Sequence, residues 1–71
     1  MVDSQLVDRA QTALSVSPHL SRRRLKLEAQ HGKLIVRGTV DSYYLKQMAQ
    51  ETLRKVDGVE TVENQLQVHW K

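Results

Sequence analysis

The sequence predicts an α+β domain in two layers, with two helices on one face of a three-stranded mixed sheet. Apolar residues recur at helical spacing over residues 6–14 and 45–56. They alternate with polar residues over 25–29, 34–40 and 62–70, which is the pattern of half-buried strands. The resulting order is α-β-β-α-β. Both helices must then bury their apolar stripes on the one apolar face of the sheet.

The composition limits the class of function. The 71 residues, taken as a single domain over 1–71, bury a thin core that leaves no room for a deep catalytic cleft. The chain has no cysteine, so a disulfide framework and a thiolate metal site are both excluded. Its apolar runs are far shorter than the roughly 20 residues that span a bilayer. We therefore expect a binding module rather than an enzyme, with no cofactor.

The first helix begins at Asp3 or Ser4, because either side-chain oxygen can accept hydrogen bonds from the free amides of the first turn. Pro18 disfavours helical backbone at Ser17 and lacks an N–H, so the helix is expected to end over 15–18. Its predicted apolar stripe consists of Leu6, Val7, Ala10, Ala13 and Leu14.

A β-hairpin follows, with His31 and Gly32 as its two-residue turn. Glycine suits the second position of a type I′ turn, where the backbone needs a positive φ. This turn places the apolar residues of both strands on one face. The register pairs Leu25 with Gly38, Leu27 with Val36, and Ala29 with Leu34. A glycine at position 38 would let a helix approach the sheet closely.

The second helix is capped by Asp41 and Ser42 and is expected to end at Gly58, the natural left-handed C-cap. A right-handed crossover through this helix makes the third strand parallel to the second. The second strand carries the most apolar run and is placed in the centre of the sheet. Asn64 is the polar residue on the inner face of the third strand, where it either sits at a bulge or bonds to backbone.

Residues 33–42 resemble the second strand and following turn of the BON domain, which is named for bacterial osmotically induced and nodulation proteins. The later landmarks of that family are matched by Ala49, Gly58, Val59, Val62, Asn64, Leu66 and Val68. The resemblance extends from Asp3 to Val68. It implies the α-β-β-α-β fold and binding of phospholipid membranes or other proteins, usually in bacterial envelope proteins. The matched positions are mostly apolar or glycine, so Gly38 and Gly58 are given structural roles, as Gly32 is by its place in the turn.

Positive charge gathers at the hairpin, within a chain of net charge +3. Lys26 and Arg37 are directly opposite each other on the helix-free face, where like charges destabilise a strand pair. Either Glu28 or Glu63 neutralises the pair, or an anionic phospholipid or protein surface binds there. The candidate binding residues are Arg22, Arg24, Lys26, Lys33, Arg37 and Tyr43.

The remaining polar and aromatic residues define the alternatives. Tyr44 and Trp70 are expected to cover the edges of the core, while Tyr43 stays exposed. The alternative is that the two tyrosines at the start of the second helix anchor in a head-group layer or a partner surface. The three histidines share no metal-ligand spacing, so no metal site is expected.

Nucleic acid is a further candidate partner, although the basic sheet face offers no aromatic residue for base stacking. A pure protein–protein or self-association module, using an open edge strand, is another alternative. The start of the chain shows no secretory leader, which predicts a cytoplasmic location, with peripheral membrane or envelope association as the alternative.

Overall fold

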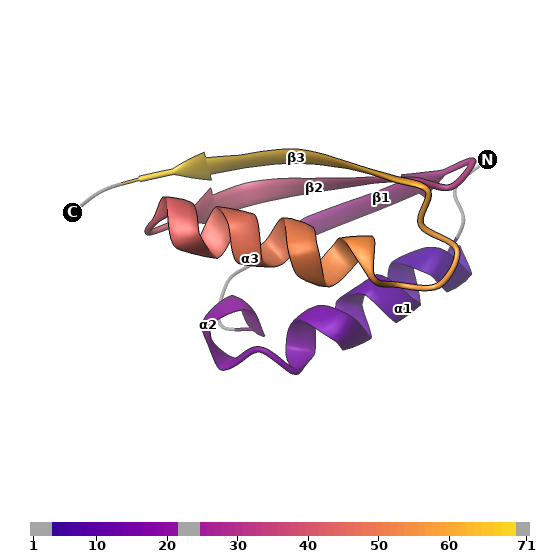
Figure 1. The fold of residues 1–71 in the computed structure, drawn as a ribbon, viewed down its shortest axis with the longest axis horizontal. Coiled ribbons are helices and arrows are strands. Elements are labelled where there is room, and N and C mark those ends of the chain that lie inside the picture. Colours follow the sequence, from indigo (N-terminus) through magenta and orange to yellow (C-terminus); the bar gives the residue numbers. More distant parts are fainter. Residues whose placement is uncertain (1–3, 22–24, 70–71) are drawn as a thin grey trace.

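The fold is an α+β sandwich in which helices cover one face of a three-stranded sheet (Figure 1). The structure, a computed structural model, describes residues 4–21 and 25–69. Its elements in chain order are α1 (Ser4–Ser15), α2 (Pro18–Ser21), β1 (Lys26–Gln30), β2 (Lys33–Val40), α3 (Tyr43–Arg54) and β3 (Thr61–Val68). The strand order is β1-β2-β3, with β1 antiparallel and β3 parallel to β2. The predicted fold class, the central second strand and the parallel third strand are therefore confirmed.

The hairpin has the predicted register and turn. Leu27 lies opposite Val36 and Ala29 opposite Leu34. His31 has φ 53° and Gly32 has φ 80°, so both turn residues adopt the left-handed backbone that a type I′ turn requires. The carbonyl of Gly32 also accepts hydrogen bonds from the backbone N–H groups of Glu60, at 2.8 Å, and Thr61, at 3.3 Å. The turn is thereby attached to the start of β3.

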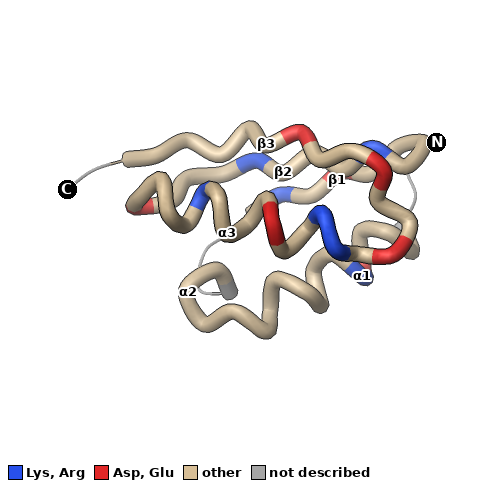
Figure 2. Tube along the Cα trace, in the orientation of Figure 1, with Lys and Arg blue, Asp and Glu red and all other residues tan. Residues whose placement is uncertain are grey.

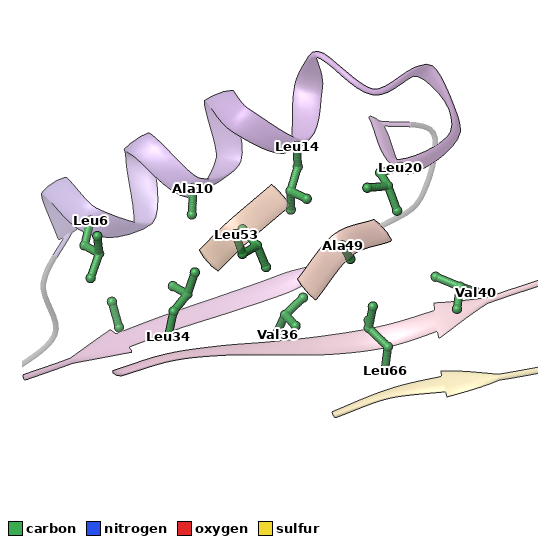
Figure 3. Close-up of a cluster of buried hydrophobic side chains, with 11 residues drawn as sticks. Leu6, Ala10, Leu14, Leu20, Leu34, Val36, Val40, Ala49, Leu53 and Leu66 are labelled. Carbon is green, nitrogen blue, oxygen red and sulfur yellow. The ribbon is translucent and has the colours of Figure 1, made fainter. Parts of the chain in front are cut away.

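The core lies between the sheet and the helices (Figure 3). The predicted stripes supply it, because the apolar residues of each helix and of the inner sheet face meet there. Burying each large aliphatic side chain contributes about 1.5–3 kcal/mol. The buried residues are Leu6, Ala10, Leu14, Leu20, Ala29, Leu34, Val36, Val40, Ala49, Leu53 and Leu66.

The short helix α2 was not predicted. Pro18 ends α1 as expected, but it also opens α2, because proline fits the first position of a helix, where no N–H bond is needed. Leu20 in this helix is buried. One turn of helix is too short to show a helical period in the sequence.

The prediction that α3 ends at Gly58 is wrong. The helix ends at Arg54, and Lys55 is its C-cap with ordinary right-handed backbone. Two further turns follow, in which the N–H of Val56 bonds to the carbonyl of Leu53 and that of Val59 to the carbonyl of Val56. Gly58, with φ 95°, serves this connection rather than the helix end.

Two other expectations involve Gly38 and the chain ends. The β1–β2 ladder begins with the pair Lys26 and Arg37, so the predicted pairing of Leu25 with Gly38 lies just beyond it. Gly38 has φ 148°, a backbone conformation that favours glycine.

The predicted Asp3 cap and the predicted cover by Trp70 lie outside the described residues. At the second helix, the Ser42 cap is confirmed, since its hydroxyl accepts from the N–H of Leu45 at 3.2 Å.

Asn64 bonds to backbone and sits at no bulge, because the β2–β3 register runs unbroken along the whole of β3. Its Nδ2 donates to the carbonyl of Lys46 in α3 at 2.8 Å and to Oε1 of Gln50 at 3.4 Å. Its Oδ1 accepts from the N–H of Leu66 at 3.1 Å. In a parallel ladder, the backbone N–H groups of every second residue point to the same neighbouring strand. The N–H of His69 bonds to β2, so the N–H of Leu66, three residues earlier, points to the free edge of the sheet. One side chain therefore joins α3 to β3 and satisfies an edge amide.

We expect Asn64→Ala to destabilise the fold by about 1–3 kcal/mol, because it removes the bond to α3 and leaves the edge N–H of Leu66 without its partner. Urea denaturation measures the free energy of unfolding. Gln67→Ala, on the exposed side of the same strand, is the control and should change stability by less than about 0.5 kcal/mol. Equal effects of the two substitutions would show that the Asn64 bonds contribute nothing.

Gly32→Ala should cost about 1–2 kcal/mol through its left-handed backbone. A Cβ at this position would also lie 2.9 Å from Oε2 of Glu60, but that flexible, exposed side chain can move away. The double variant with Glu60→Ala separates the two causes in denaturant melts. The loss should persist in the double variant, and full recovery there would show that crowding, not backbone strain, sets the cost.

Candidate functional site

The predicted basic residues of the hairpin lie on the face of the sheet that no helix covers. Strand alternation brings Lys26 from β1 together with Lys33 and Arg37 from β2 on this side, where all three are exposed. We call this side the outer face. Its described side chains are Lys26, Glu28, Gln30, Lys33, Ile35, Arg37, Thr39, Thr61, Glu63, Gln65 and Gln67.

Arg37 is held by residues of both neighbouring strands. Its Nη1 lies 3.3 Å from Oε1 of Glu28 in β1. Its Nε donates to Oε1 of Gln65 in β3 at 2.9 Å. The guanidinium thus spans all three strands while its side chain remains 49% exposed.

Lys33 has a separate partner. Its Nζ lies 3.0 Å from Oε1 of Glu63. Gln65 donates through Nε2 to the other oxygen of Glu63, which links this pair to the Arg37 cluster. The hydrogen bond from Lys33 is the main cause that holds the pKa of Glu63 below its ordinary value, and Gln65 adds to it. Both pairs are well exposed to solvent, so each contributes little to stability.

Lys26 is different, because its side chain makes no ion pair or hydrogen bond with any residue of the described ranges 4–21 and 25–69. It nevertheless lies opposite Arg37. Neutralisation by glutamate is therefore confirmed for Arg37, through Glu28. The same explanation does not extend to Lys26.

The structure does not bring every predicted site residue to the outer face. Tyr43 begins α3, in the helix layer, and so lies on the other side of the sheet. Arg22 and Arg24 lie outside the described residues. Of the three glycines that were given structural roles, Gly32 lies in the hairpin turn, Gly38 in β2 and Gly58 in the α3–β3 connection.

The expectation that Tyr44 covers the edge of the core is wrong, since its side chain is 69% exposed. It points away from the helix face that carries Ala49 and Leu53, as its position outside the apolar stripe could have indicated. A shallow groove on α3 is lined by Tyr44, Gln47, Met48 and Glu51. This groove was not predicted from the sequence.

Two kinds of feature are absent from the described residues, a membrane-spanning helix and a metal-binding cluster. None of the helices there is long and apolar enough to cross a bilayer. Those residues contain no group of three histidine or carboxylate side chains placed to hold a metal ion.

The ion pair of Glu63 with Lys33 should make the free energy of unfolding depend on pH. Because the folded pKa of Glu63 lies below the unfolded value, its carboxylate stabilises the fold above that unfolded value, near 4.5. This contribution is lost as the pH falls through the folded pKa. The difference in unfolding free energy between the wild type and Glu63→Gln should therefore be present at neutral pH and vanish in acid. In a Lys33→Gln background the difference should shrink, and an unchanged difference would contradict the assigned cause.

Comparison with known proteins agrees with this architecture. A family model described as the BON domain matches residues 2–69, which is nearly the whole chain. No curated protein gives a significant match. BON domains are phospholipid- or protein-binding modules and are generally not enzymes. With the fold and the family match in agreement, the chain belongs to the BON-domain family.

Proposed function

We propose that this chain is a non-enzymatic module that docks on an anionic phospholipid surface through the cations of the outer face. The observation that carries the proposal is Lys26, an exposed cation without a partner among the described residues, set opposite Arg37. Glu28 already offsets the charge of Arg37, so the unpaired charge is that of Lys26, which a bound phosphate would neutralise. The proposed location is peripheral, at a membrane or cell envelope.

Arg37 supports the same function. A guanidinium has five N–H donors, and the contacts with Glu28 and Gln65 engage only part of them. The rest can bind a head-group phosphate while the two neighbours keep the side chain in place. Lys33 contributes less to the proposal, because Glu63 already neutralises it.

Phospholipid is favoured over nucleic acid by the residues of the outer face. The described part of that face carries no aromatic side chain on which a base could stack. An acidic protein surface could use the same cations and is the second outcome that the experiment distinguishes.

Reversing the charge of Lys26 should weaken binding to anionic vesicles. Each basic residue near such a surface contributes about 1 kcal/mol. Lys26→Glu removes one positive charge and adds a negative one, so it should lower the affinity about thirtyfold. Lys55→Glu is the matched control, because Lys55 is an exposed cation at the far end of α3 and gives the same change of net charge. Co-sedimentation with phosphatidylglycerol vesicles at low salt measures both.

Equal losses in the two variants would show that only net charge matters, and no binding by the wild type would overturn the lipid proposal. A gel shift with nucleic acid that weakens steeply with salt would support the nucleic-acid alternative. A protein captured without either activity would support a protein-interaction module.

A further inference from the structure

Three large hydrophobic side chains are exposed among the described residues. They are Val16, 79% exposed, Tyr43, 63%, and Tyr44, 69%. Val16 lies in the turn between α1 and α2, and the tyrosines open α3. Figure 1 places this turn and the start of α3 at the same end of the molecule, the end toward which β2 and β3 run. Single exposed hydrophobic residues are common, but three gathered at one end indicate a contact surface.

A contact between the two segments joins these residues into one surface. The hydroxyl of Ser17, next to Val16, donates to Sδ of Met48 at 3.5 Å. Met48 lies one helical turn after Tyr44, and both line the groove on α3. We call the surface formed by Val16, Tyr43, Tyr44 and Met48 the apolar end.

The charges around the apolar end favour an anionic partner. Glu51, at the margin of the groove, is paired with Arg54 at 3.1 Å, and Asp41 is engaged in an interaction within the chain. Lys46, on the first turns of α3, makes no ion pair in the described part of the molecule. Lys26 is likewise unpaired and begins β1 at this end of the hairpin.

Most acidic residues lie away from the apolar end (Figure 2). Glu60, for example, lies at the opposite end of β2, where its N–H bonds to the carbonyl of Gly32 in the hairpin turn. The turn end also carries cations (Figure 2), but Lys33 there is paired with Glu63, whereas Lys26 and Lys46 make no ion pair in the described part of the chain.

We infer that the apolar end inserts into the head-group layer of an anionic phospholipid bilayer, so that the domain docks end-on. This inference rests on the proposed function and adds the orientation and the inserted residues. Tyrosine suits this layer, because its ring is apolar and its hydroxyl polar. Lys26 and Lys46 lie at the rim, where they meet phosphates, while Lys33 near the turn stays remote. A second copy fits less well, since stable protein interfaces use about 20–30 residues a side.

The absence of cysteine from the chain gives a direct test. Val16→Cys and Tyr44→Cys, each labelled with an environment-sensitive fluorophore, report burial at the apolar end. Gln30→Cys, exposed beside the turn, is the matched control. With phosphatidylglycerol vesicles we expect a blue shift and a several-fold rise in emission at positions 16 and 44, and no change at position 30.

Co-sedimentation of the same labelled proteins separates the two proposals. Binding without a shift at positions 16 and 44, or with a shift at position 30 instead, overturns the end-on orientation and leaves the proposed function standing. Failure of the unlabelled wild type to bind overturns the proposed function itself. As a second variant, Val16→Ser with Tyr44→Ser alters only exposed side chains and should weaken binding several-fold with unchanged salt dependence. Unaltered binding would contradict insertion.

Discussion

Burial of one face of β2 determines how the other strands and the helices are arranged. Leu34, Val36 and Val40 are completely buried, and β2 pairs with a strand on each side. The parallel pairing with β3 requires a crossover, which α3 provides over the same face that α1 covers. With every helix on one side, the opposite face of the sheet is left to solvent, and charged side chains can occupy it.

That one-sided arrangement also makes the two ends of the molecule different. At the turn end, the carbonyl of Gly32 binds the start of β3, and the chain there is closed by backbone hydrogen bonds. At the other end, α3 begins directly after β2, and its first residues, Tyr43 and Tyr44, project from the helix layer. A long, narrow domain, 37 × 20 × 17 Å, thus presents a polar end and an apolar end.

Much of this architecture follows from sequence period alone, because alternation decides which side of a strand is buried. The register around Gly32 was predictable in this way, whereas for Asn64 the alternation left a bulge and a bond to backbone as alternatives. Helix α2 and the end of α3 were not, since a single turn has no period and Gly58 can serve a loop as well as a cap. The site was less predictable still. Which cation each glutamate would neutralise depends on three strands at once, and so does the isolation of Lys26.

The inferred orientation places the apolar end of the domain in the membrane. Nuclear magnetic resonance of the ¹⁵N-labelled protein with anionic nanodiscs that carry a lipid-attached paramagnetic probe tests it most directly. Broadening of the backbone amide signals should be greatest at residues 16–20 and 41–46, weaker near Lys26 and smallest at the hairpin turn. Broadening centred on the turn, or spread evenly over the outer face, would contradict the claim.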